Sequence, residues 1–264
     1  MIVTHKPVEF EPIGVYQPSK LAVGSFGLSG SGKSAFFCTM PGKTGIVTLD
    51  DKTKPIVEKR AAELGIKNGK ILFPKGQDYI RYEHPLKVAQ MSIDDSIRFY
   101  SDLKIRILDA IYTLVERTDV SSIGFDGGMQ MSELCLLANY GRLRRIMPRD
   151  RGPYNEDMAN FFNALRTKNC VITHKASEIW EGPEEKRRPS GRYEWKGHGE
   201  LDYFMDCVIE HTYDEVEKEW YLSINRSNPR PDLIGAPGYH LLNGAMVRFD
   251  ALFLQLWPNA ELPV

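Results

Sequence analysis

The sequence predicts an α/β fold: a mostly parallel central sheet flanked by helices, with an antiparallel extension near the C-terminus. A glycine-rich loop joins an apolar run to a helical pattern, further apolar runs alternate with helical patterns, and two late runs flank a short polar turn. The chain has 264 residues, 42% of them hydrophobic, enough for one large domain. We expect a single domain over residues 1–264, comprising an N-terminal arm at 1–19, a helical insertion at 76–118 and a C-terminal extension at 236–264.

The glycine-rich loop reads GLSGSGKS and matches the spacing G-x-x-x-x-G-K-[ST]. Its glycines let successive backbone N–H groups turn toward an anion, and the start of the next helix adds further N–H donors. In the alternative interpretation, the loop is a plain turn between strand and helix. We expect nucleotide and Mg²⁺ binding, with Lys33 on the outer phosphates and Ser34 on the metal; the nucleotide-binding residues are Gly27, Leu28, Ser29, Gly30, Ser31, Gly32, Lys33, Ser34 and Ala35.

Apolar runs at 21–26, 45–49, 71–73, 121–126 and 170–173 predict the strands of the parallel sheet. A short helix follows the glycine-rich loop and stops at Pro41-Gly42. Longer helices are predicted at 92–117, from apolar spacings of three and four, and at 155–168, where Asn155 is the expected cap. Segments 141–155 and 174–200 read as loops, and 207–210 and 220–224 as antiparallel strands.

Several predicted strands end in polar side chains, which meet at one edge of a parallel sheet. Asp126 is the expected second carboxylate for Mg²⁺; an ordinary turn aspartate is the alternative. Asp50 or Asp51 is expected to orient or deprotonate water, unless both lie in an exposed turn. His174 can contact the outer phosphate, or serve as an ordinary hydrogen-bonded residue.

Two basic segments are candidates for binding nucleic acid. The first lies between Tyr140 and Tyr154, which can stack on bases; the second contains Tyr193 and Trp195 but also several glutamates. A solvated loop or a subunit contact is the alternative for the first. The candidate arginines are Arg142, Arg144, Arg145, Arg149 and Arg151 in the first segment, and Arg187, Arg188 and Arg192 in the second.

Composition limits the other possibilities. The net charge is −1, from 34 basic and 35 acidic residues, so the overall field favours no polyanionic partner. The cysteines lie far apart among apolar residues, which indicates buried free thiols in a reducing compartment and no zinc spacing. We see no signal peptide or membrane-length apolar run, and expect a cytoplasmic protein without a membrane partner. The cysteines are Cys38, Cys135, Cys170 and Cys207.

The order of the blocks GLSGSGKS, IVTLDD, IGFDGG, NEDMANFFNALRTKNCVITHK and LSINRSNPRP resembles the RecA-like P-loop ATPases, most of all the compact phage-encoded branch linked to single-strand annealing and recombination. The resemblance covers about residues 20–235. It implies Mg²⁺-dependent ATP hydrolysis by a homo-oligomer, ring or filament, that binds single-stranded DNA, with other recombination or replication proteins as further partners. If the chain is phage-encoded, its location is the host cytoplasm.

The resemblance also implies residue roles. The carboxylate after the second strand, Asp50 or Asp51, activates water, and His174 senses the outer phosphate, although glutamine is commoner there. A late Lys-Asn-Arg block supplies a cation to the neighbouring subunit's nucleotide; here Arg226 matches and the lysine is absent.

Two other functions compete. A RecA- or KaiC-like motor or regulatory ATPase would act on protein partners, and a small-molecule kinase would use residues 181–200 as a lid. The kinase is disfavoured by the paired acids at 50–51 and the block at 224–226. A GTPase is disfavoured because no N-K-x-D motif is present.

Overall fold

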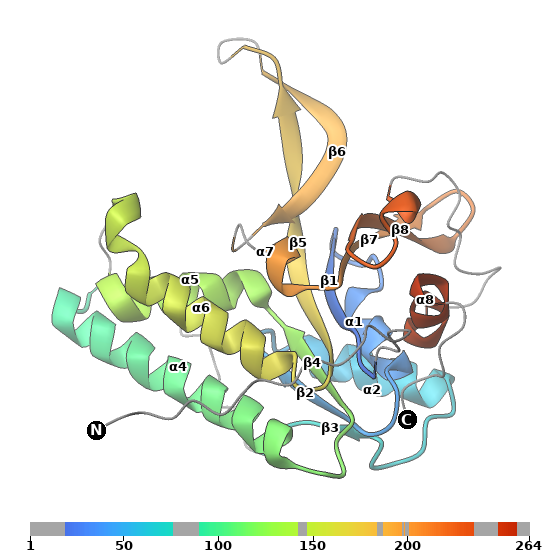
Figure 1. The fold of residues 1–264 in the computed structure, drawn as a ribbon, viewed down its shortest axis with the longest axis horizontal. Helices are drawn as coiled ribbons and strands as arrows, with labels where there is room; N and C mark the ends of the chain where they lie inside the picture. Colours follow the sequence, from blue (N-terminus) through green and yellow to red (C-terminus); the bar gives the residue numbers. More distant parts are fainter. Residues whose placement is uncertain are drawn as a thin grey trace, which may run out of the picture.

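The computed structural model describes residues 19–75, 90–141, 147–183, 187–196, 198, 201–234 and 248–257. Their centre is one sheet with the strand order β3-β2-β4-β5-β1-β7-β8, and β6 pairs with β5 outside this path (Figure 1). The neighbours from β3 to β7 are parallel, whereas β7–β8 and β5–β6 are antiparallel. The predicted fold class is therefore confirmed, including the antiparallel C-terminal strands.

The strands match the predicted runs closely, with two exceptions. Strand β6 was not predicted, and β5 continues well beyond its predicted run at 170–173. Most boundaries differ from the prediction by a residue or two, while β7 and β8 extend further. The strands are β1 Ala22–Gly27, β2 Thr44–Thr48, β3 Ile71–Leu72, β4 Ser122–Asp126, β5 Asn169–Glu181, β6 Arg188–Lys196, β7 Cys207–Asp214 and β8 Glu219–Ser227.

The helices lie in two layers, one on each face of the sheet (Figure 1). One layer contains α4, α5, α6 and α7; the other contains α1, α2, α8 and a short 3-10 helix, η1. The helices are α1 Lys33–Phe36, η1 Phe37–Thr39, α2 Thr53–Glu63, α4 Ile93–Glu116, α5 Gly128–Tyr140, η3 Pro148–Asp150, α6 Gly152–Leu165, α7 Leu201–Phe204, η5 Pro231–Leu233 and α8 Phe249–Leu256.

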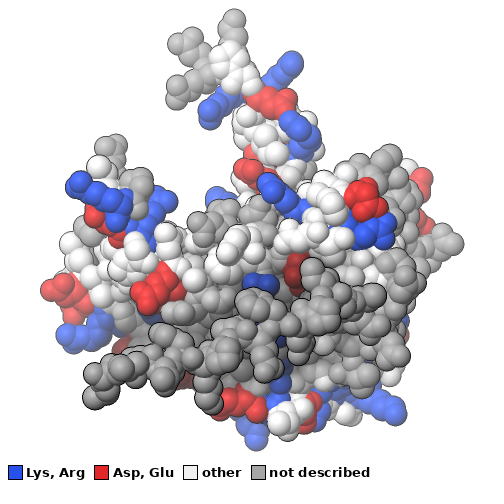
Figure 2. All heavy atoms as spheres, viewed as in Figure 1, with Lys and Arg blue, Asp and Glu red and all other residues white. Residues whose placement is uncertain are grey.

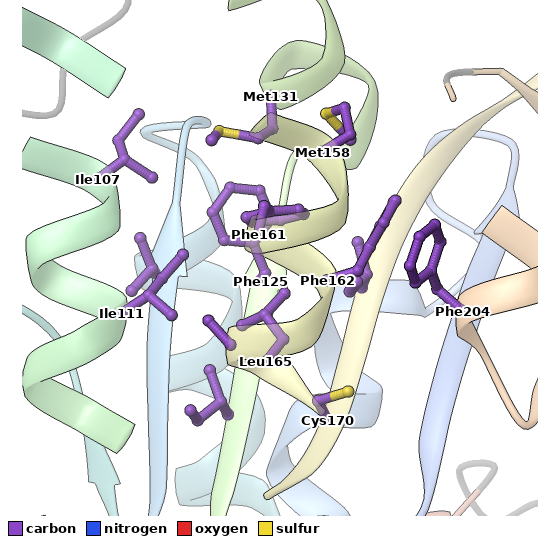
Figure 3. Packing of buried hydrophobic residues seen from close by; sticks show 14 of the residues in the cluster. Ile107, Ile111, Phe125, Met131, Met158, Phe161, Phe162, Leu165, Cys170 and Phe204 are labelled. Atoms are coloured by element: carbon purple, nitrogen blue, oxygen red, sulfur yellow. The ribbon is translucent and has the colours of Figure 1, made fainter. Parts of the chain in front are cut away.

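The larger hydrophobic cluster lies between the sheet and α4, α5 and α6 (Figure 3). Phe125 on β4 meets Phe161 on α6 edge-on, with ring centroids 4.8 Å apart, and Phe162 stacks on Phe204 of α7 at the same distance. The predicted long helix, α4, begins at a Ser92 cap whose hydroxyl accepts from the Asp95 N–H. Its buried face belongs to the same cluster, so this part of the predicted 76–118 insertion is integral to the core; residues 76–89 lie outside the described part.

The second cluster covers the opposite face of the sheet. Phe36 and Phe37, from α1 and η1, pack with Phe249, Leu252 and Phe253 of α8 and with side chains of β1, β2, β7 and β8. The C-terminal helix is thereby attached beside the helix that follows the glycine-rich loop.

Three helical predictions need correction. Helix α6 begins at Gly152 rather than at an Asn155 cap, because Pro153 fits the first turn and the Asn155 N–H already donates to the Arg151 carbonyl. The sequence analysis did not predict α2. It also missed α5, although Met131, Leu134, Cys135 and Ala138 carry helical spacing and are buried.

The prediction of a polar loop over 174–200 was wrong. β5 continues beyond the sheet to Glu181 and pairs with β6, forming a two-stranded projection that we call the β5–β6 ribbon, described over residues 175–183 and 187–196 (Figure 1). The alternation in Arg-Tyr-Glu-Trp-Lys is the strand signal that the polar composition obscured.

All four cysteines are buried free thiols, as predicted. Burial raises the pKa of Cys38 to about 11 and the pKa of Cys135 and Cys170 to about 12. These thiols are protonated and unreactive near neutral pH. Within the described ranges, we find no helix with both the length and the apolar character needed to cross a bilayer.

Candidate nucleotide site

The glycine-rich loop lies where the prediction placed it, between β1 and α1. It borders a pocket of about 630 Å³ that is lined by every residue from Gly27 to Ala35 and by the carboxyl ends of β4 and β5. At Gly27 φ is +152°, and a Cβ there would lie 2.3 Å from the His211 carbonyl oxygen. Only glycine fits this strand end, which lets the loop turn back over the sheet.

Lys33 points back into the loop. Its Nζ donates to the carbonyl oxygens of Gly27, at 2.8 Å, and Leu28, at 2.7 Å, and lies 3.5 Å from the Ser31 hydroxyl. Burial lowers the pKa of Lys33, and the nearby Asp126 carboxylate acts in the opposite direction. The cation is therefore held at the centre of the loop by weak acceptors that an anion can replace.

Asp126 is the centre of a hydroxyl network at the end of β4. Its carboxylate accepts from the Ser34 hydroxyl at 3.1 Å and also from the hydroxyls of Thr53 and Thr173. Parallel pairing places Asp126 level with Thr48 on one side and Thr173 on the other. The two residues predicted for Mg²⁺, Ser34 and Asp126, thus meet directly, and hydroxyl and carboxylate oxygens are the donors that Mg²⁺ prefers.

The structure separates the two adjacent acids after β2. Asp50 lines the pocket, and its Oδ1 accepts from the backbone N–H of Lys52 at 3.0 Å, where α2 begins. Both side chains are exposed, but Asp51 does not line the pocket. Of the pair, Asp50 alone is positioned to act on a molecule bound there.

His174 lies in β5 where the strand leaves the sheet, within the pocket wall, but is itself buried. Its Nδ1 donates to the Lys196 carbonyl oxygen at 3.2 Å, at the base of the β5–β6 ribbon, and its Nε2 has no hydrogen-bond partner among the described residues. Burial lowers the pKa of His174 to about 4, so the ring is neutral at pH 7. With the proton on Nδ1, Nε2 presents a lone pair and cannot donate to a phosphate oxygen.

Sequence reasoning missed several residues of this site. Thr53 comes from the unpredicted α2, and His211 lies on β7 with a pKa lowered to about 3 by burial and by nearby Lys33. Trp220 on β8 and Arg60 on α2 also line the pocket. No local motif marks these four positions, because strand order and helix packing bring them to the loop.

The described basic candidates lie away from the pocket in two places. Arg149 and Arg151 are exposed at η3 and the start of α6, and Arg149 is only 3.8 Å from Asp150. The others are exposed on the β5–β6 ribbon, where Arg192 is paired with Glu181; they are Arg187, Arg188 and Arg192. Arg142, Arg144 and Arg145 lie outside the described residues.

The aromatic residues of the two basic segments make contacts within the chain, and the Tyr140 hydroxyl donates to the Asp150 carbonyl oxygen at 2.6 Å. Tyr154 is buried, with its hydroxyl 2.7 Å from that of Ser132. Tyr193 and Trp195 are half-buried against the main cluster, and Trp195 packs edge-on against Phe26 of β1 at 6.2 Å. These contacts attach the ribbon to the sheet.

Arg226 is exposed on β8, paired in register with Val208 of β7. It does not line the pocket of its own chain.

No family model and no curated protein matches the sequence. Among solved structures, the chain is similar to the KaiC-like protein PH0186 from Pyrococcus horikoshii OT3, with 14% identity, 79% of each chain covered and a TM-score of 0.37. A likeness at this level carries no functional inference.

Proposed function

We propose that this chain is a Mg²⁺-dependent, RecA-like ATPase that binds single-stranded DNA as a homo-oligomer. The meeting of Ser34 and Asp126 beside the glycine-rich loop supports the proposal most strongly. Two residues 92 positions apart, both predicted from the sequence to bind the same metal, lie within hydrogen-bond distance. A plain structural turn would not require a carboxylate and three hydroxyls at this edge.

The loop amides and the start of α1 bind the triphosphate. Lys33 exchanges the carbonyls of Gly27 and Leu28 for phosphate oxygens, forming stronger charge-assisted bonds. Ser34 and Asp126 hold Mg²⁺, which offsets the negative charge of the phosphates. Thr53 and Thr173 orient the Asp126 carboxylate.

Asp50 orients the attacking water and accepts its proton. The bond that breaks joins the γ-phosphorus to the bridging oxygen, which remains with the diphosphate. The Lys52 N–H holds one carboxylate oxygen of Asp50, and the other is then available to the water.

His174 connects the pocket with the ribbon. To donate to a phosphate oxygen, its proton must occupy Nε2, and the bond from Nδ1 to the Lys196 carbonyl is then lost. A change in the proton position on His174 would therefore alter one of several contacts at the base of the ribbon, beside the Lys175–Lys196 pairing and the Trp195 contact with Phe26.

Two groups of arginines support DNA binding. Figure 2 shows basic side chains on the projecting ribbon and at the nearby end of the helical layer, where η3 and α6 meet. A single strand passing between these parts would contact both groups, and each contact would replace condensed counterions. Since Arg226 lies outside its own pocket, we assign it to the nucleotide of the adjacent subunit.

The test combines nucleotide and DNA binding. We expect single-stranded DNA affinity to rise with a non-hydrolysed ATP analogue and to fall steeply with salt in a gel-shift titration. The Lys33→Ala variant should lose both ATP binding and this enhancement. DNA binding that is undetectable at low salt, with ATP turnover intact, would instead favour a motor or regulatory ATPase acting on proteins.

A further inference from the structure

One end of the pocket is bordered by Trp220 on β8 and Arg60 on α2. The Trp220 Nε1 donates to the Gly30 carbonyl oxygen at 3.5 Å, and a Cβ at Gly32 would lie 3.1 Å from the indole Cδ1. The indole therefore lies directly against the glycine-rich loop, next to the predicted phosphate position.

The indole is held in place by its neighbours. The Arg60 guanidinium lies over the ring, 5.5 Å from its centroid, and is itself paired with Glu63 at 2.6 Å. Tyr213 packs against the same indole at 4.9 Å. An aromatic plane fixed beside a phosphate loop, with a partly exposed guanidinium over it and Tyr213 against it, is suited to stacking.

We propose that Trp220 and Arg60 form the base subsite of this pocket, and that it accepts purine rings by stacking without distinguishing adenine from guanine. The base takes the place of the guanidinium over the indole. A cation–π contact between partly exposed groups is weak, so the larger overlap of two aromatic planes replaces it.

The lack of discrimination follows from the groups around the indole. Stacking is tolerant because every base has a π-face, whereas base identity is read through hydrogen bonds to ring edges. The Glu63 carboxylate is occupied by Arg60. Gln130, the one amide side chain among the described pocket residues, lies instead beside Gly127 at the Asp126 end.

This inference rests on the proposed function, since it requires a triphosphate in the loop. Calorimetric titration with ATP, GTP and inorganic tripolyphosphate, each with Mg²⁺, separates binding of the base from binding of the triphosphate. For the unaltered protein we expect ATP and GTP affinities within about threefold of each other, with CTP and UTP weaker because a pyrimidine offers less stacking area.

Trp220→Ala should weaken ATP and GTP binding by about tenfold and leave tripolyphosphate binding unchanged; Trp220→Phe should retain most of the affinity. Trp180, 55% exposed on the β5–β6 ribbon, provides the matched control, and Trp180→Ala should bind all three ligands normally.

Each contrary result has a distinct meaning. Unchanged ATP binding in Trp220→Ala, or an equal loss of ATP and tripolyphosphate, would overturn the base subsite. Binding of ATP without GTP by the unaltered protein would overturn the purine tolerance. Failure of the unaltered protein to bind either ATP or tripolyphosphate would overturn the proposed function itself.

Discussion

The two halves of β5 differ in how they are held. From Asn169 to His174 the strand is buried between β4 and β1, with hydrogen-bonded neighbours on both sides. From Lys175 onward it pairs mainly with β6 and is half-buried to exposed. The first half fixes Thr173 against Asp126, whereas a two-stranded ribbon is only marginally stable by itself. We therefore expect ATP hydrolysis to depend on the inner half of β5, and single-stranded DNA binding to depend on the outer half.

The largest effect is expected at the fixed end, from Asp126→Asn. An amide cannot supply the negative charge that the metal requires, and it leaves hydroxyl donors facing an NH₂ group. We expect ATP turnover, measured by phosphate release, to fall at least about a hundredfold.

The adjacent acids Asp50 and Asp51 provide a matched pair of variants. Asp50→Asn should also remove most turnover, while Asp51→Asn, the same change on an exposed side chain outside the pocket, should stay within about twofold of the unaltered protein. The reverse pattern would assign the water to Asp51.

A shortened ribbon tests the outer half. Joining Ser177 to Glu194 through Asn-Gly, in place of residues 178–193, keeps the contacts of His174 with Lys196 and of Trp195 with Phe26. We expect single-stranded DNA affinity to fall more than about tenfold at low salt, since three arginines are lost. ATP affinity should not change, and a parallel loss of both would contradict the division of β5.

The smallest effect concerns pH at the junction of the two halves. The pKa of His174 is lowered to about 4, so the unfolded chain binds protons more readily and stability falls as pH drops from about 6.5 toward 4. His174 should contribute about 2–3 kcal/mol to this loss. Urea unfolding of His174→Gln should show a shallower decline, to which His211, whose pKa is also lowered by burial, still contributes; identical pH profiles would contradict the assignment.

The nucleotide site beside the inner half of β5 could largely be predicted from the sequence. The glycine-rich loop has fixed spacing, and Asp126 ends an apolar run, so both could be placed without coordinates. The parallel sheet followed from the same runs, because buried strands are continuous apolar segments.

The rest depended on tertiary packing. Thr53 reaches Asp126 only because β2 and β4 are neighbours, and Trp220 meets the loop only through the β7–β8 pairing. The ribbon was mistaken for a loop because its polar side chains obscured a period of two, and α5 was missed although its apolar spacing was present.

The contact between Gly128 and His174 has a consequence for sequence change. A Cβ at Gly128 would lie 2.4 Å from the His174 Nε2, so the imidazole occupies the volume that any larger residue at 128 would need. In homologous chains the two positions should therefore vary together: alanine or serine at 128 requires a smaller or differently directed side chain at 174. Substitution at 128 alone should therefore be rare, whereas position 174 can accept a smaller side chain while glycine remains at 128.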